Sequence, residues 1–506
     1  MRKEIERLIE LDREQVLLGH IEALLGWDQA TYMPSKAIEE RADQIALVEG
    51  LAHERQISPE IGSILAALGS TADNPMGDPA LSDPERAYLR VWRRQYDRET
   101  KLPAALVSEY ARETSKSLAA WAKAREQNDF AGFAPCIEKM FRLSKERAAC
   151  LNPEGRPYDV LLDLYEPGAS EASVGAIFSA LRTELSSLLG KIRSRPQVDS
   201  SFVSRPCDDA HQAAISSWLM NELNYDKGCG RLDTVEHPFT TTIGEHDVRI
   251  TTRYLRSDFT SSMFSTIHES GHALYELGIA VPEAFRRTRL ADAASMAVHE
   301  SQSRLWENMV GRSESFWRPR YAKLQELAGG ALDGVNREHF VRGINRVEPS
   351  LIRTEADEVT YCLHIILRFE LESDLLAGRL AVKDLPEAWN NKMKELLGIV
   401  PPDNKSGCLQ DMHWAEGYIG YFPSYALGNI YAAQFWDKMH NEHPDMEERL
   451  AAGDCRCVLD WLRKNVHSGG AAWLPSEIIR NSTDEPLNPA HYINYLNRKY
   501  AKVYGF

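Results

Sequence analysis

Residues 262–278 read SMFSTIHESGHALYELG, and their apolar positions recur with the period of an α-helix that ends near Gly278. His268 and His272 are four residues apart, so on a helix they lie on one face, one turn apart. Two imidazoles arranged in this way can bind one cation. Glu269 leaves the helix in a neighbouring direction, which suits a general base acting on water. The stretch therefore predicts a metal-binding helix. The alternative is an amphipathic helix with two exposed or capping histidines.

A catalytic zinc site needs a third protein ligand and one open position. Gly278 stands where some zinc motifs have a third histidine, so the ligand must come from elsewhere. The next strongly helical segment, residues 292–307, carries Glu300, which leaves enough chain after His272 for a turn between two packed helices. Glu300 is therefore the first candidate.

Two other glutamates compete with Glu300 for this position. Glu276 lies on the same helix as the two histidines, so it cannot easily complete a tetrahedron with them and suits a place around the site. Glu307 is the next alternative. Asp292 is the expected N-cap of the second helix.

Composition limits the class of protein. The chain has 506 residues, of which 43% are hydrophobic and 26% charged, and its formal charge is −15, which argues against a nucleic-acid partner. Its eight cysteines are irregularly spaced, which indicates free thiols in a reducing compartment. The charged N-terminus has no apolar segment behind it, and no apolar run is long enough to span a bilayer. We therefore expect a cytoplasmic protein without a membrane partner.

Most of the chain has helical periodicity, including residues 104–124, 174–192 and 210–223. Near the N-terminus, apolar residues from Ile5 to Leu25 predict one buried stripe, which Asp12 interrupts once. Two segments rich in turn residues, 70–83 and 401–407, predict loops.

One segment alternates with period two. In residues 247–254, Val248, Ile250, Thr252 and Tyr254 face one way, which predicts a half-buried strand. Gly244 indicates a turn from an earlier extended piece, residues 238–243. We therefore expect a mainly α protein with one small β-sheet near its middle, and the strand could also pair with the backbone of a bound peptide.

Short motifs along the chain accompany the metal helix. They are WDQATYMP at 27–34, HPF at 237–239, D-x-R-x-T at 247–251, HESQ at 299–302, IRTEA at 352–356 and GCLQDMHW at 407–414. In this order they resemble the thermostable (Taq-type) metallocarboxypeptidase family, and the resemblance covers most of the chain. Leu277 is a small departure, because many relatives have Gln there.

The resemblance implies a fold and an activity. Glu300 becomes the third metal ligand, and residues 262–307 hold the site. The fold would be that of the long-grooved helical metallopeptidases related to neurolysin and angiotensin-converting enzyme, with residues 1–506 forming a single catalytic domain of two helical lobes around a groove. The activity would be metal-dependent removal of single C-terminal residues from peptides, with broad specificity and proline disfavoured. Such enzymes are homodimers that use zinc, or cobalt in some members, with one ion per subunit.

Further residues have expected roles. His413 and Tyr425 are candidate donors to the oxyanion, with aromatic packing as the alternative. Arg353 is the first candidate to bind the substrate's terminal carboxylate, because the resemblance places it in the groove and a guanidinium offers two parallel hydrogen bonds. Arg249 is the second candidate, with an ion pair to Asp247 as its alternative. His237 either lines the site or caps a turn, and Asp247 and Gln410 complete the expected substrate-binding residues.

Two other functions compete with the carboxypeptidase. An endo-acting oligopeptidase of the neurolysin type would share the metal helix. A non-catalytic peptide-binding protein with a structural metal would have no need of Glu269, whose presence argues against it.

Overall fold

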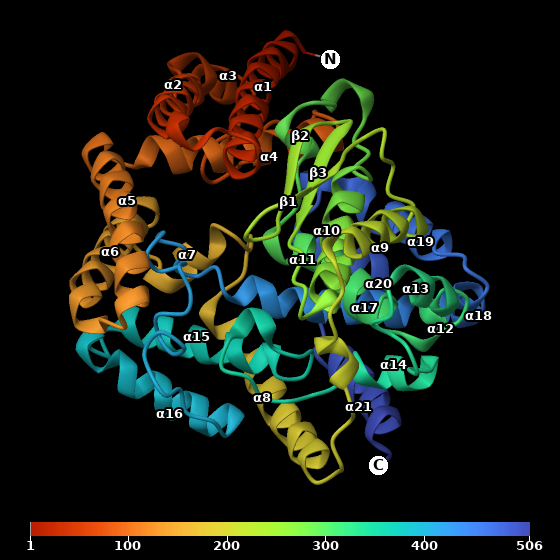
Figure 1. Ribbon diagram of the computed structural model, residues 1–506. Coiled ribbons are helices and arrows are strands. Elements are labelled where there is room, and N and C mark those ends of the chain that lie inside the picture. Colours follow the sequence, from red (N-terminus) through yellow and green to blue (C-terminus); the bar gives the residue numbers. More distant parts are fainter. Residues whose placement is uncertain (1) are drawn as a thin grey trace. The chain divides into compact units, whose positions relative to one another are not determined.

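The computed structural model describes residues 2–506 and is mainly α-helical (Figure 1). The chain forms two compact units, each made of three stretches. The first unit comprises Met1–Thr100, Asp199–Ile344 and Phe435–Pro486, and the second comprises Lys101–Val198, Asn345–Gln434 and Leu487–Phe506. The expectation of one catalytic domain with two lobes around a groove stays a prediction.

The first unit contains the small sheet and most of the shorter helices. Its elements are α1 (Lys3–Thr31), α2 (Ile38–Gln56), α3 (Pro59–Ala67), α9 (Asp209–Glu222), β1 (Leu232–Thr234), β2 (Thr240–Gly244), β3 (Asp247–Thr252), α10 (Phe259–Glu276), α11 (Met296–Arg304), α12 (Glu314–Trp317), α13 (Tyr321–Leu327), α14 (Arg337–Gly343), α18 (Met446–Ala451), α19 (Arg456–Asn465) and α20 (Pro475–Thr483).

The second unit is built from helices of mixed length. These are α5 (Ala104–Gln127), α6 (Phe130–Leu151), α7 (Pro157–Asp163), α8 (Glu171–Arg193), α15 (Tyr361–Ala377), α16 (Leu385–Leu397) and α21 (Ala490–Tyr504). Two helices, α4 (Asp83–Lys101) and α17 (Pro423–Glu442), contain residues of both units. The predicted helices are confirmed, and both predicted loops lie outside helices except for Asp83, which is the first residue of α4.

The sheet of the first unit has the order β1-β3-β2, with β1 parallel and β2 antiparallel to β3. The predicted hairpin is confirmed, and Val248, Ile250 and Thr252 are buried as expected. Tyr254 lies beyond the end of the strand. The expectation that this strand pairs with a peptide is wrong, because β3 lies between β1 and β2 and both of its edges are already hydrogen-bonded.

The apolar stripe predicted for α1 is only half correct. Ile5, Leu8 and Ile9 are buried, whereas Leu17 and Leu24 are 58% and 39% exposed. Asp12, expected to interrupt the stripe, is itself fully buried.

A polar network explains the burial of Asp12. Its carboxylate accepts hydrogen bonds from the Arg289 side chain at 2.8 Å, from the Arg289 backbone N–H at 3.0 Å and from the Tyr88 hydroxyl at 2.9 Å. A buried carboxylate with three donors is satisfied without solvent, so hydrophobic periodicity alone could not locate it.

Two other expectations concern the whole chain. All eight cysteines are free thiols among the residues described, as predicted. In the same range, 2–506, no helix is both long and apolar enough to cross a membrane.

Candidate active site

Helices α10 and α11 pack closely at the point where the histidines lie. Asp258 caps the start of α10 by accepting from the backbone N–H groups of Thr260 and Ser261. A Cβ added to Gly271 would stand 2.7 Å from Ser303 Cα, inside van der Waals contact with the backbone of α11. Only glycine therefore allows the two helices to approach this closely.

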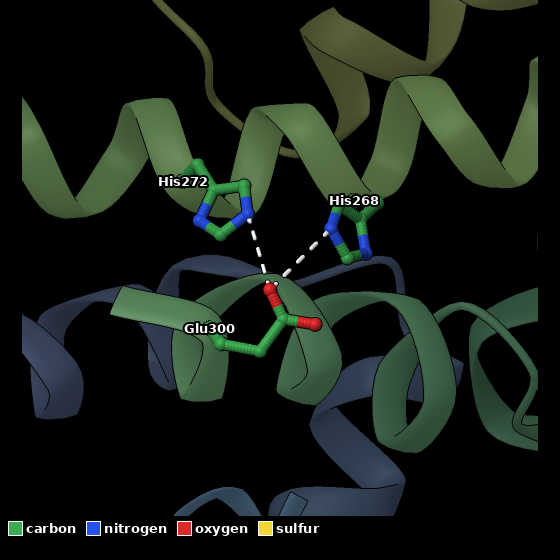
Figure 2. Close-up of side chains that lie close together, drawn as sticks. All are labelled: His268, His272 and Glu300. Atoms are coloured by element: carbon green, nitrogen blue, oxygen red, sulfur yellow. Dashed lines mark ion pairs between the residues drawn. The ribbon is translucent and has the colours of Figure 1, made fainter. Parts of the chain in front are cut away.

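Side chains of these two helices converge on one point. Figure 2 shows His268 and His272 descending from α10 toward Glu300 on α11. The Nε2 atoms of His272 and His268 lie 3.6 and 3.9 Å from Glu300 Oε2. The three ligand atoms all lie within 4.8 Å of one another, a spacing that suits one cation at their centre.

The hydrogen bonds behind the two histidines also suit a cation. His268 Nδ1 lies 2.9 Å from Glu307 Oε2, and His272 Nδ1 lies 3.1 Å from the carbonyl oxygen of His299. Each Nδ1–H therefore donates to an oxygen and leaves Nε2 to face the centre, as is usual for metal-binding histidines. Burial, and then the neighbouring His299, hold the pKa of His272 well below its usual range, so its imidazole is neutral. These residues fit a divalent metal.

Glu269 lies beside this cluster and is buried. The Thr240 hydroxyl, at the start of β2, lies 2.6 Å from Glu269 Oε2 and donates to it. Burial raises the pKa of Glu269. A carboxylate with a raised pKa that is held by one hydrogen bond suits transient proton transfer.

The two competing glutamates, Glu276 and Glu307, contact histidines of the cluster or beside it rather than facing its centre. Glu276 Oε1 accepts from His299 Nε2 at 2.8 Å, and the His299 ring lies against that of His272, tilted by 30°, with centroids 4.4 Å apart. Glu307 contacts His268. Sequence reasoning did not predict the part of His299, although it directly precedes Glu300.

The start of α11 differs from expectation. Ser295, whose hydroxyl accepts from the backbone N–H of Val298 at 3.1 Å, is the N-cap of this helix. Asp292, predicted for that place, is exposed and instead lines a cavity of about 520 Å³ in the first unit, together with Thr242 and Glu276.

In the second unit, Arg353 belongs to a buried cluster that contains two guanidinium groups and one carboxylate. Arg353 Nη2 lies 2.9 Å from Asp411 Oδ1, and Arg368 Nε lies 2.7 Å from Asp411 Oδ2. Although burial opposes it, Arg368 and then Arg353 hold the pKa of Asp411 well below its usual range. The two cations therefore share one full negative charge. The sequence did not single out Arg368.

Gln410 supports this cluster. Its Oε1 accepts from the Arg353 backbone N–H at 2.9 Å and from Arg368 Nη2 at 2.8 Å, and its Nε2 donates to three backbone carbonyls. The carboxamide is thus engaged within the protein, and its contact with substrate stays a prediction.

His413 and Tyr425 also meet in the second unit, with His413 Nε2 and the Tyr425 hydroxyl 3.2 Å apart. Burial, and then the charge of Arg353, lower the pKa of His413 to about 3, so its imidazole is neutral. Within residues 2–506 its Nδ1 is buried without a hydrogen-bond partner.

The remaining candidates are Arg249, Asp247 and His237. Arg249 pairs with Asp247 through two hydrogen bonds of 2.8 and 2.7 Å and lies over the Trp27 ring at 4.2 Å. This is the ion pair weighed as the alternative to carboxylate binding. His237 is exposed between β1 and β2.

A helical fold with two histidines and a carboxylate around one point, and a glutamate beside them, defines a metallopeptidase of the His-Glu-x-x-His class. The sequence profile of the carboxypeptidase Taq (M32) metallopeptidases matches residues 7–500. Thermostable carboxypeptidase 1 of Thermus thermophilus is 41% identical over 99% of each chain, and carboxypeptidase 1 of Bacillus subtilis is 38% identical over 95% of each. The crystal structure of the M32 carboxypeptidase from Deinococcus radiodurans R1 is similar with a TM-score of 0.95, at 39% identity, over the whole of both chains.

This chain therefore belongs to the carboxypeptidase Taq (M32) metallopeptidase family and is a metallocarboxypeptidase that acts on peptides. The endo-acting alternative is not favoured, because the matched relatives are named carboxypeptidases.

Proposed function

We propose that this enzyme is a zinc carboxypeptidase that releases single residues from peptide C-termini, with broad side-chain tolerance and proline disfavoured. The observation that carries the proposal is the cluster of His268, His272 and Glu300, whose ligand atoms lie within 4.8 Å of one another beside Glu269. We assign these three residues as ligands of one Zn²⁺ per subunit, with Co²⁺ as an alternative ion. When bound, the ion supplies a Lewis acid that polarises the scissile carbonyl and activates water.

Glu269 acts as general base in this proposal. Its carboxylate takes a proton from the attacking water and later passes it to the leaving amine. The hydrogen bond from Thr240 orients the carboxylate during both transfers. Because the pKa of this carboxyl is raised toward neutral pH, the group can both accept a proton and return it.

His413 and Tyr425 stabilise the oxyanion that forms on the scissile carbonyl. The neutral imidazole carries one N–H and the phenol one O–H. When His413 Nε2 carries the proton it donates to the Tyr425 hydroxyl, and the Tyr425 O–H can then donate to the oxyanion. Their mutual contact limits the positions that either ring can take.

Arg353 binds the terminal carboxylate of the substrate. The charge balance of its cluster supports this role, because within residues 2–506 Arg353 and Arg368 both make their direct ion pair with Asp411. A carboxylate from the substrate would balance the second guanidinium in a buried place, where an unpaired charge is costly. Gln410 keeps the backbone of Arg353 in place.

The test is digestion of a mixed peptide set followed by mass spectrometry, with matched peptides whose C-terminus is an amide. Stepwise loss of C-terminal residues, stopped by a chelator and restored by Zn²⁺ or Co²⁺, is expected. Peptides ending in proline should be cleaved slowly. Cleavage of the amidated peptides at internal bonds would contradict the proposal and favour an endo-acting oligopeptidase.

We further propose, on the family resemblance, that the enzyme is a cytoplasmic homodimer. Light scattering after gel filtration tests the second point, with a mass of twice 57.2 kDa expected.

A further inference from the structure

We propose that Arg304 and Glu307 are positioning residues of the metal centre. Arg304 occupies one oxygen of Glu300, so that this carboxylate offers the ion only its other oxygen, and Glu307 orients the ring of His268. The inference rests on the ligand set proposed above.

Arg304 contacts Glu300 of α11 and Glu307 of the segment that follows α11. Its Nε donates to Glu300 Oε1 at 2.6 Å, and its Nη1 donates to Glu307 Oε2 at 3.2 Å. The oxygen that faces the two histidines is the other one, Oε2. Arg304 is one helical turn after Glu300, and both side chains are largely shielded from solvent, so the pair is held in one geometry.

Both oxygens of Glu307 accept hydrogen bonds from side chains of the protein. Its Oε2 accepts from His268 Nδ1 at 2.9 Å, and its Oε1 accepts from Arg312 Nη2 at 3.3 Å. Residues Leu305–Val310 form a short π-helix, so Glu307 lies in a locally widened turn that directly follows Arg304. Carboxylates placed behind a ligating histidine fix the ring and the nitrogen that carries the proton.

The number of oxygens that Glu300 offers matters for catalysis. A catalytic site keeps one position open for water or substrate. If both oxygens of Glu300 were free to turn toward the ion, the second would compete for that open position. The guanidinium of Arg304 opposes this, because its Nε is already hydrogen-bonded to Oε1 while its Nη1 is held by Glu307.

The experiment uses the full-length enzyme with Co²⁺ as a spectroscopic probe, because the visible absorption of Co²⁺ weakens as the number of ligand atoms rises. Chelator competition measures the affinity for Zn²⁺ in parallel. Arg304→Gln should weaken the cobalt absorption. Arg304→Lys keeps the charge but loses the guanidinium, so its absorption should lie between those of the wild type and Arg304→Gln. Glu307→Gln should lower Zn²⁺ affinity by about 10- to 100-fold.

Arg320→Gln is the matched control. Arg320 is a buried arginine of the same unit whose Nε pairs with Glu222 at 2.8 Å, and within residues 2–506 its hydrogen bonds go neither to the three ligands nor to Glu307. It should lower stability but leave the cobalt spectrum and the Zn²⁺ affinity of the folded protein unchanged.

Three outcomes are distinguishable. A wild-type enzyme that binds neither ion, or that binds equally well after Glu300→Gln, would overturn the proposed ligand set. A wild-type enzyme that binds normally, with Arg304→Gln and Glu307→Gln variants that match it in spectrum and affinity, would overturn only the positioning roles. Changes in both variants but not in Arg320→Gln support them.

Discussion

Replacing Gly271 with alanine should separate the two helices that carry the proposed metal ligands. The added Cβ would lie 2.7 Å from Ser303 Cα and 2.8 Å from the Gln302 carbonyl oxygen, both of them backbone atoms. Carbon atoms in contact prefer a separation of about 3.5–4.0 Å. Helices α10 and α11 must therefore move apart locally by about 1 Å.

This movement affects stability and metal binding together. Overpacking of this kind costs about 1–3 kcal/mol of unfolding free energy. The contact lies one residue before His272 and three after Glu300, so the 3.6 Å separation of their ligand atoms would change as well. Metal–ligand distances tolerate only about ±0.2 Å, so Zn²⁺ affinity should fall along with stability.

The assay is thermal unfolding of the metal-free protein, together with chelator competition for Zn²⁺. Gly190→Ala is the matched control, because Gly190 lies in helix α8 and an added Cβ there would meet nothing within 4 Å. The control should be neutral or more stable by about 0.5–1 kcal/mol. A Gly271→Ala protein with wild-type unfolding and wild-type Zn²⁺ affinity would refute the account of helix packing.

Three further predictions concern single side chains. Glu269→Gln should keep Zn²⁺ affinity but lower kcat by at least about 10²-fold, since general-base catalysis contributes on that scale; wild-type hydrolysis would exclude the base role. Arg353→Lys should raise KM for peptides with a free C-terminal carboxylate, because the bidentate guanidinium is lost. The ratio of kcat/KM for these peptides to that for amidated peptides should therefore fall. An unchanged ratio would count against Arg353 as the residue that binds the terminal carboxylate. Burial lowers the pKa of His467 to about 3, below its unfolded value, so its contribution to stability is complete above about pH 6.5 and is lost as the pH falls toward 3. In the His467→Gln variant, the free energy of unfolding, measured by urea titration, should therefore fall less steeply between pH 7 and pH 4 than in the wild type. A pH dependence equal to that of the wild type would contradict this.

Local sequence determined the elements of the site. The histidine spacing and apolar period of residues 262–278 correspond to α10, and the alternation of residues 247–252 corresponds to β3. These elements can be predicted because the side chains of a helix or a strand repeat their direction every few residues, so a short segment contains the whole pattern.

Two features depended on the packing of distant segments. Asp12 is buried because Arg289 and Tyr88 satisfy it, although their sequence positions give no sign of that contact. Strand β3 is central because β1 pairs with its free edge. The start of α11 is a different case, because its N-cap Ser295 is a local hydroxyl cap that the sequence offered beside the predicted Asp292.

The choice among three glutamates shows the same division. The sequence by itself determined that His268 and His272 share a helical face and that a carboxylate must join them, and the family resemblance selected Glu300. Tertiary structure alone decided that Glu300 turns toward the histidines while Glu276 and Glu307 stand behind them. The physical reason is that a metal cluster is a long-range contact between two helices, and its geometry depends on how closely they approach, which Gly271 permits.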